Sequence, residues 1–273
     1  MRKIIITLLF FATTWAMAGN DITILHTNDT HSCILPTNSN LSDTTMAGRG
    51  GFLRRITMLR EERAKDPELL YFDSGDFFQG SAFFTLFRGE VEVALMNLMG
   101  LDAVALGNHE WDAGMEGLAV CLKKASFPVI CTNLDFSSTP LEGLIKPYVI
   151  LHRKGKKIGV FALSPKLEGL VEKKAYGPVN YSDPSTCALQ TATMLKEKEH
   201  CDIVICLSHL GWSEGGDKTM IRSSRNIDIV LGGHSHSFFQ TLQYEKNLDG
   251  KEVPVDQNGK SAVFVGKIIL HCE

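Results

Sequence analysis

Residues 102–114, DAVALGNHEWDAG, place a short apolar run directly before a turn that is crowded with polar groups. The run DAVAL is typical of a buried strand. An amide, an imidazole and two carboxylates follow it closely, at Asn108, His109, Glu110 and Asp112, and a helical pattern comes next. A strand that leads through a polar loop into a helix is the building unit of an α/β fold.

The same alternation continues along the chain and predicts a single α/β domain. Apolar runs predict strands at 21–27, 69–73, 102–106, 127–132, 158–163, 201–209 and 227–233. Apolar residues at three- and four-residue spacing predict helices at 52–65, 88–99, 114–125 and 184–199. The segment from residue 247 onward is interpreted as turns followed by a closing strand at 262–270.

The first 18 residues are predicted to be a secretory signal peptide. Arg2 and Lys3 precede an apolar run, and the small residues at 16–18 provide a cleavage site. The run is shorter than the ~20 apolar residues of a spanning helix, which disfavours the alternative of a retained membrane anchor. We therefore expect one catalytic domain at 19–273 that is exported to the periplasm and is not bound to a membrane after cleavage.

The composition excludes some classes of function. The formal net charge of -3 leaves no basic footprint for a nucleic-acid polymer. The seven cysteines leave at least one thiol unpaired in an oxidising compartment, and no spacing matches a CxxC zinc site. Buried free thiols or an incidental disulfide are favoured over a catalytic role.

Polar side chains follow five of the predicted strands, at the point where each strand ends. These segments are 28–31, 73–76, 107–110, 208–209 and 232–236. In open α/β sheets the carboxyl ends of the strands form the rim where sites are built. The segments contain five of the nine histidines, which marks one candidate site. The other four histidines are given structural roles, His26 within a strand and His152, His200 and His271 at the surface.

The donors at this rim predict a site for two metal ions. Two aspartates, one asparagine and four histidines offer oxygen and nitrogen atoms and no thiolate, so hard or borderline divalent ions fit better than heme or iron–sulfur clusters. Seven donors are too many for one catalytic zinc, which takes about three protein ligands. They suit two ions that share a carboxylate and act together on a phosphoryl group. Zinc, manganese, iron, magnesium and calcium all remain candidates.

The five polar segments, in their order along the chain, resemble a known set of motifs. ILHTNDTH, FDSGDFFQG, ALGNHEWDAG, CLSHLG and DIVLGGHSH resemble the five blocks of the calcineurin-like metallophosphoesterases, in particular the secreted 5'-nucleotidase and UDP-sugar hydrolase branch. GGFLRR, KPYVI and VGKIIL are also similar to segments of that branch. The resemblance implies a four-layer α/β/β/α sandwich, two sheets with helices outside. It also implies that the C-terminal nucleotide-specificity domain usual in the branch is absent from this chain.

The resemblance further implies the role of each site residue. Ligands of the first metal are Asp29, His31 and His236, ligands of the second metal are Asn108, His209 and His234, and Asp76 bridges the two ions. His109 and Asn108 contact the substrate phosphate. His109 is the catalytic histidine that stabilises charge or protonates the leaving oxygen, and Asp112 holds its imidazole in position. Glu110 and Trp111 are interpreted as capping and packing residues of the following helix.

The expected function is hydrolysis of phosphate esters, most of all 5'-nucleotides or related nucleotide esters, by a metal-bound hydroxide with His109 assisting. Three alternatives stay open. The chain acts alone as a general phosphomonoesterase or phosphodiesterase, with Phe77, Phe78, Phe83, Phe84 and Phe87 as a substrate wall if they do not simply pack against a helix. It is one subunit of a split nucleotidase whose specificity lies on a separate polypeptide. Or it binds metal or ligand without turnover, which the complete set of site residues disfavours.

Overall fold

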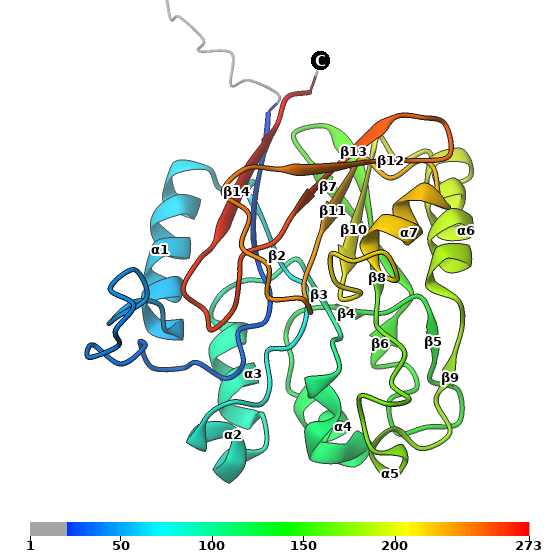
Figure 1. Ribbon diagram of the computed structural model, residues 1–273. Helices are drawn as coiled ribbons and strands as arrows, with labels where there is room; N and C mark the ends of the chain where they lie inside the picture. The colour runs from blue at the N-terminus through cyan, green and yellow to red at the C-terminus, as the bar shows by residue number, and fades with distance from the viewer. Residues whose placement is uncertain (1–20, 273) are drawn as a thin grey trace, which may run out of the picture.

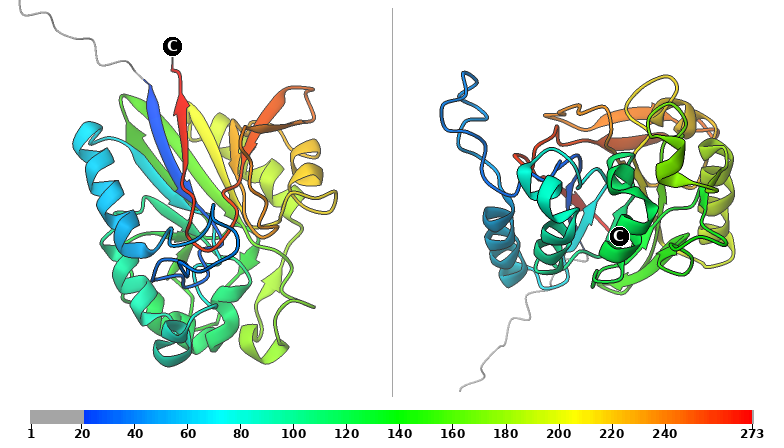
Figure 2. Two further views of the ribbon diagram at one scale, coloured as in Figure 1. Left: turned by 60° about the vertical axis from the view of Figure 1, so that its left-hand side comes forward. Right: turned by 90° about the horizontal axis from the view of Figure 1, so that it is seen from below.

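The computed structural model describes residues 21–272, so the predicted signal peptide lies outside the described residues. The domain has four layers, in which two six-stranded sheets face each other and helices cover the outer face of each sheet (Figures 1 and 2). This is the predicted α/β/β/α sandwich. Within the described chain, no helix is both long enough and apolar enough to cross a membrane.

The first sheet has the strand order β14-β1-β2-β3-β4-β6. Five of its strands are parallel, and β14 pairs antiparallel with β1 at the edge. The strands are β1 (Ile22–Thr27), β2 (Leu70–Asp73), β3 (Ala103–Ala105), β4 (Val129–Ile130), β6 (Ile145–Lys146) and β14 (Gly266–Leu270). Parallel pairing places the carboxyl ends of β1, β2 and β3 at one rim.

The second sheet has the strand order β12-β13-β11-β10-β8-β7. Its four central strands are parallel, and β7 and β12 pair antiparallel at the two edges. The strands are β7 (Tyr148–Arg153), β8 (Lys156–Leu163), β10 (Ile203–Ser208), β11 (Ile229–Leu231), β12 (Gln243–Lys246) and β13 (Glu252–Asp256). The carboxyl ends of β10 and β11 therefore also share one rim.

The helices divide between the two outer faces, α1, α3 and α4 against the first sheet and α6 and α7 against the second (Figure 1). Their bounds are α1 (Phe52–Lys65), α2 (Ala82–Phe87), α3 (Glu90–Asn97), α4 (Gly114–Leu122), α5 (Lys173–Tyr176), α6 (Pro184–Glu197) and α7 (Asp217–Arg222). A 3-10 helix, η1 (His109–Ala113), precedes α4. The short strands β5 (Leu134–Asp135) and β9 (Asn180–Tyr181) form a separate two-stranded sheet.

Three apolar cores fill the three spaces between the four layers. Along β1, Ile24 points into the core between the sheets, whereas Leu25 points into the core beneath α1, α3 and α4. Along β10, Ile205 faces the space between the sheets, and Val204 faces α6 and α7. Because successive side chains of a strand point to opposite faces, a strand buried on both sides is a continuous apolar run.

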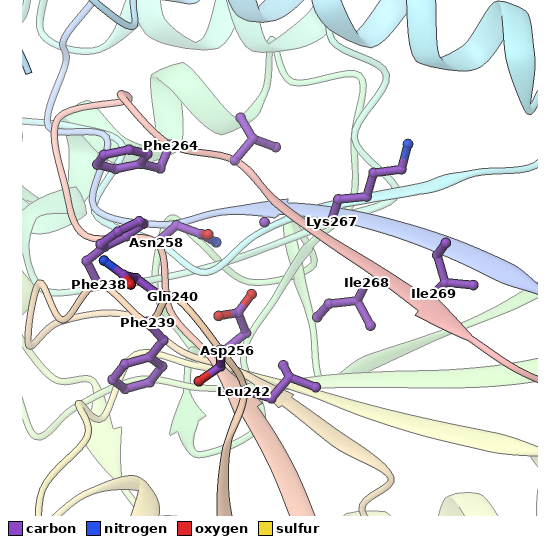
Figure 3. A pocket seen from close by; sticks show the side chains of 13 residues that line it. Phe238, Phe239, Gln240, Leu242, Asp256, Asn258, Phe264, Lys267, Ile268 and Ile269 are labelled. Atoms are coloured by element: carbon purple, nitrogen blue, oxygen red, sulfur yellow. The ribbon is translucent and has the colours of Figure 1, made fainter. Parts of the chain in front are cut away.

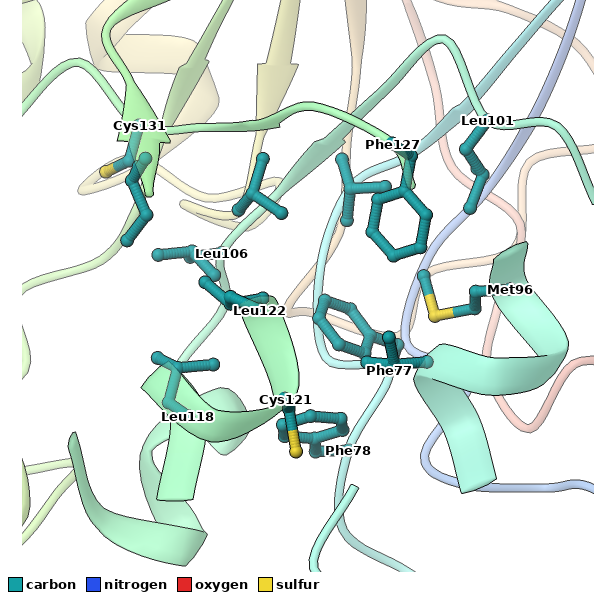
Figure 4. Close-up of a cluster of buried hydrophobic side chains, with 14 of the residues drawn as sticks. Phe77, Phe78, Met96, Leu101, Leu106, Leu118, Cys121, Leu122, Phe127 and Cys131 are labelled. Carbon is teal, nitrogen blue, oxygen red and sulfur yellow. The ribbon is translucent and has the colours of Figure 1, made fainter. Parts of the chain in front are cut away.

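The phenylalanines after Asp76 belong mainly to the core of the first helical layer. Phe77, Phe78 and Phe84 are buried in this core. Figure 4 shows Phe77 and Phe78 beside Met96 of α3 and Cys121 of α4. Phe83 is partly buried against the same cluster, and only Phe87 is largely exposed. The interpretation that these rings pack against a helix is therefore confirmed for the three buried ones. The alternative, that they form a wall of the substrate site, is wrong for those three.

The structure confirms the longer predicted elements and corrects several others. Helix α1 has the predicted bounds, and Asp183 caps α6 by accepting a hydrogen bond from the N–H of Thr186 at 2.8 Å. The predicted helix at 88–99 begins only at Glu90, because α2 forms a separate helix before it. The segment predicted as turns contains strand β13, and the closing strand β14 begins at Gly266 rather than at 262.

The cysteines and the remaining histidines have structural positions. None of the seven cysteines is paired with another in the described chain, and burial raises the pKa of the Cys131 thiol to about 12. His26 is buried in β1, where it contacts the Asp256 carboxylate at 2.9 Å. His152, His200 and His271 are exposed, as predicted.

Candidate metal centre and active site

The structure brings all the predicted site residues to one rim of the sandwich. The loops after β1, β2 and β3 of the first sheet meet the loops after β10 and β11 of the second sheet. Within this rim, His and Asp side chains form groups whose potential ligand atoms lie within 4.8 Å of one another. The two sheets therefore contribute donors to a shared site.

The first group consists of Asp29, His31 and His236. The Nε2 atoms of His31 and His236 lie 2.9 Å apart, and Nε2 of His236 lies 3.4 Å from Oδ1 of Asp29. The Asp29 carboxylate is fully buried. Two imidazole nitrogens that converge on a buried carboxylate form a pocket suited to a divalent cation.

The second group consists of Asp76, His209 and His234. His209 is buried, and its Nδ1 bonds to the carbonyl oxygen of Ser74 at 2.7 Å, which directs Nε2 toward the site. That Nε2 atom lies 3.0 Å from Oδ2 of Asp76 but makes no hydrogen bond. A histidine whose second nitrogen is held by a backbone carbonyl is the usual arrangement of a metal ligand.

The loop after β3 carries a further oxygen donor, the side chain of Asn108. Its Oδ1 atom is buried and has no hydrogen-bond partner in residues 21–272. A buried polar atom without a partner is costly, because nothing replaces the water that it loses on folding. An amide oxygen of this kind is a ligand type that suits a hard or borderline divalent ion.

The electrostatics of the rim also favour cations. Burial would lower the pKa of His209, but the carboxylates of Asp76 and Asp29 outweigh it and raise that pKa to about 10. Asp76 is buried as well, yet the positive His209 ring holds its pKa below the usual range. The two carboxylates thus create a negative potential around His209, which a divalent ion would neutralise when bound.

The backbone at these residues has an uncommon conformation. Positive φ angles occur at Asp29 (48°), His31 (45°), Asp76 (57°), His234 (69°) and His236 (54°). Non-glycine residues adopt this region rarely and at some energetic cost, so the surrounding packing must impose it. Such residues are concentrated at sites whose geometry serves a function.

Glu110 holds two of the site loops together. Its buried carboxylate accepts hydrogen bonds from the N–H groups of Asp76 at 3.0 Å and Phe77 at 2.8 Å, and from those of Phe78 at 3.2 Å and Gly107 at 2.6 Å. The expectation that Glu110 caps the following helix is therefore wrong, because its acceptors are used by the neighbouring loop. Trp111 is fully buried and stacks on Phe136, as its packing role predicts.

Gly107 passes so close to the site that no side chain fits there. A Cβ atom at this position would lie 2.2 Å from Oδ1 of Asp76 and 2.7 Å from Nε2 of His209. We therefore expect Gly107→Ala to push these two groups apart and to lower the metal content of the purified protein, measured by elemental analysis. Gly215→Ala is the control, because its Cβ would meet no atom within 4 Å. Full metal content in Gly107→Ala would contradict the close approach.

His109 and Asp112 form a pair beside the metal groups. Nδ1 of His109 lies 2.8 Å from Oδ2 of Asp112, and this hydrogen bond raises the pKa of His109. The backbone N–H of His109 donates to Oδ1 of Asp76 at 2.8 Å. His109 also falls in a third close group, with His31 and Asp76, so its geometry allows a ligand role as well as an acid role.

A cavity of about 300 Å³ opens above these histidines. His31, His109 and His236 line it, together with residues that the sequence analysis did not single out, namely Cys33, Gln79, Gly80, Lys260 and Ser261. Lys260 belongs to the turn NGK, which gave no signal of a role at the site. The cavity contains no phenylalanine, tyrosine or tryptophan among its lining residues.

A second cavity, of about 710 Å³, lies between strand β14 and the segment 238–242 (Figure 3). The stacked rings of Phe238 and Phe264 are part of its lining, with ring centroids 4.2 Å apart. Its Asp256 carboxylate is bonded to His26 and to the N–H of Gln257. None of the predicted site residues lines this cavity.

Comparison with known proteins identifies the family. Residues 22–238 match the model of the calcineurin-like phosphoesterases. The chain belongs to this family. The matched stretch contains both metal groups and the His109–Asp112 pair, and the family is one of metal-dependent phosphoester hydrolases.

Calcineurin-like phosphoesterases similar to this chain include several proteins named as nucleotidases. The human 5'-nucleotidase is 34% identical over 89% of this chain and 42% of its own length. The structure of the 5'-nucleotidase precursor from Thermus thermophilus has a TM-score of 0.83 and 31% identity, over 93% of this chain and 52% of that one. The NAD nucleotidase of Haemophilus influenzae has a TM-score of 0.80 and 29% identity, over 91% and 47%. The chain thus spans about half the length of these relatives.

Proposed function

We propose that this chain is a two-metal phosphoester hydrolase that acts on 5'-nucleotides or related nucleotide esters. The observation that carries the proposal is the pair of His/Asp groups at the rim, together with the unpartnered oxygen of Asn108 and the His109–Asp112 pair. The similarity to proteins named 5'-nucleotidase supports nucleotides as the substrate class.

In this proposal the residues of the rim divide between two ions. Asp29, His31 and His236 would hold the first ion. His209, His234 and Asn108 would hold the second, and Asp76, which falls in one group with His31 and in another with His209 and His234, would be available to both. When bound, two divalent ions lower the pKa of a water molecule and neutralise charge on the phosphoryl oxygens.

His109 acts on the leaving oxygen of the ester. Asp112 occupies its Nδ1 atom, so the other ring nitrogen is available to the cavity above the metal groups. The charged imidazole stabilises negative charge on the phosphoryl group and donates its proton to the departing alcohol. Asp112 is a positioning residue, because it fixes the orientation and the protonated form of the ring.

A second candidate function follows from the lining of the cavity over the histidines. Its residues offer polar atoms and a cation to a phosphate, but no aromatic ring on which a nucleobase could stack. A general phosphomonoesterase or phosphodiesterase would need no such ring. A split nucleotidase would take its base-binding surface from a separate polypeptide.

The predicted leader at 1–18 supports a location outside the cytoplasm, and we propose the periplasm as the compartment. Free divalent ions and small phosphate esters are the only partners that the chemistry of the rim requires. The metals themselves stay open among zinc, manganese, iron, magnesium and calcium.

The test is hydrolysis of AMP, a UDP-sugar, a cyclic nucleotide and an aryl phosphate by the purified mature chain with added manganese or zinc. We expect rapid release of phosphate from AMP and its loss when a chelator removes the ions. Hydrolysis of the aryl phosphate alone would contradict the proposed nucleotidase activity and favour the second candidate function. If protein that contains both metals hydrolysed none of these esters, the proposal that the chain is an enzyme would be refuted. The chain would then be a domain that binds metal or ligand without turnover.

A further inference from the structure

The loop that follows β13 lies against the metal site but beyond the stretch that matches the family model. It comprises residues 257–262, QNGKSA, and is called the 257–262 loop below. One of its residues, Lys260, lines the cavity over His31, His109 and His236. The loop therefore places a positive charge beside the proposed phosphate position.

Three hydrogen bonds join this loop to the loop after β1, which carries the first metal group. The N–H of Asn258 donates to Oδ1 of Asn28 at 2.9 Å, and Nδ2 of Asn28 donates to the carbonyl oxygen of Gly259 at 2.8 Å. The N–H of Ser261 donates to the carbonyl oxygen of Asp29 at 2.8 Å. The residues on both sides of Lys260 are thus bonded to the backbone or side chains of the metal loop.

Further hydrogen bonds join the 257–262 loop to the loop after β11. Oε1 of Gln257 accepts from Oγ of Ser235 at 2.7 Å and from the N–H of Ser237 at 3.1 Å. The N–H of Gly259 donates to the carbonyl oxygen of Ser237 at 2.8 Å. Because His236 lies between these two serines, the loop is fixed to both sides of the first metal group.

The backbone of the loop is held in one conformation and leaves one side chain free. Gly259, Ser261 and Ala262 have φ angles of 66°, 63° and 59°, which the packing must impose at the two non-glycine residues. Gln257, Asn258, Gly259 and Ala262 are buried, Ser261 is partly buried and Lys260 is exposed. The position of the Lys260 Cα is therefore fixed, while its ammonium group can reach a ligand in the cavity.

Lys260 has no ion-pair partner in residues 21–272, although several other lysines do. It is also the one lysine or arginine among the residues that line the cavity over the histidines. An unpaired ammonium group on a fixed loop, beside two candidate metal groups, is available to bind a phosphate oxygen.

We propose that Lys260 binds a terminal phosphoryl oxygen of the substrate and makes the site selective for phosphomonoesters over phosphodiesters. The proposal rests on the proposed function, since it concerns the substrate of the same site. A phosphomonoester carries about 1.5 to 2 negative charges near neutral pH. A diester replaces one of the three terminal oxygens by a second organic arm and keeps a single charge. An ammonium group stabilises the extra charge of the monoester and gains nothing from the arm.

The test compares Lys260→Ala with the wild-type protein on an aryl phosphomonoester and the matching bis-aryl phosphodiester. A lost charge-assisted hydrogen bond predicts a roughly 10-fold fall in kcat/KM for the monoester and a smaller fall for the diester. Calorimetry should show weaker binding of inorganic phosphate by a similar factor, while elemental analysis shows unchanged metal content. Lys260→Arg keeps the charge and should recover most of the monoester activity.

Lys251→Ala is the matched control, because Lys251 is exposed at the other end of β13 and pairs with Asp228 at 3.6 Å. It should leave both activities and phosphate binding unchanged. Equal losses on the two esters in Lys260→Ala, or no loss on either, would overturn the role of Lys260 while the proposed function stands. Wild-type protein that contains metal but cleaves neither ester would instead refute the proposed function.

Discussion

Replacement of His109 by alanine is expected to lower kcat by about 10²- to 10⁴-fold and to leave the metal content of the protein unchanged. The variant lacks the imidazole that we propose acts at the leaving oxygen, whereas Asp76, His209 and the first metal group should keep their positions. The backbone N–H of His109, which bonds to Asp76, is retained in the variant. The loss should therefore appear in turnover and not in the assembly of the site.

This result also decides between the two roles that the geometry allows for His109. Its ring lies within 4.8 Å of potential ligand atoms of His31 and Asp76, so a ligand role would make His109→Ala lose metal. Elemental analysis and kcat, measured on the same preparation, separate the two cases. His152→Ala is the control, because His152 is exposed on β7. Unchanged kcat in His109→Ala would exclude it as the acid.

Replacement of Asp76 by asparagine is also expected to lower kcat strongly, and in this variant the metal content should fall as well. Asp76 supplies the negative charge that lies 3.0 Å from Nε2 of His209, and it lies within 4.8 Å of His31 in one group and of His234 in another. Asparagine keeps the size and an acceptor for the N–H of His109 but loses the charge. Metal ions stabilise the transition state of phosphoryl transfer by several kcal/mol. Loss of that stabilisation corresponds to a fall in kcat on the order of 10³-fold or more.

The control for this variant is Asp102→Asn, which removes a different, mostly buried carboxylate. Asp102 lies at the opposite end of β3 and pairs with Arg153 at 2.6 Å. Asp102→Asn should lower the melting temperature without changing the ratio of metal to protein. If Asp76→Asn kept both metals and its turnover, the shared position of this carboxylate between two ions would be wrong.

The rim could be predicted from the sequence because the polar segments directly follow apolar runs. Asp29 follows β1 and Asp76 follows β2, so parallel pairing brings them together whatever the details of the loops. The order of the strands in two separate sheets has no local signal. It depends on contacts such as the pairing of β1 with β14, which joins residues from the two ends of the domain.

Other features could not be predicted, for reasons that differ between them. Strand β13 contains Pro254, which is typical of turns and edges, and it becomes a strand only through pairing with β11 and β12. Glu110 lies beside the site residues and next to a helix start, so its sequence position suggested a cap. Its four acceptor contacts come mostly from the β2 loop, and only the folded arrangement identifies them. No sequence motif marks Lys260, because its proposed role depends on the hydrogen bonds that hold the 257–262 loop against the loops after β1 and β11.

The division of the metal groups between two sheets constrains how this protein matures. Asp29, His31, Asp76 and Asn108 come from the first half of the chain, whereas His209, His234 and His236 come from the second. The group of Asp29, His31 and His236 and the group of Asp76, His209 and His234 each take donors from both halves, and contacts between such distant segments require costly loop closure. Neither of these two groups is therefore complete until the two sheets have docked. Ions that bind these complete groups favour the native state over partly folded states. The supply of metal therefore influences the yield of folded protein as well as its activity.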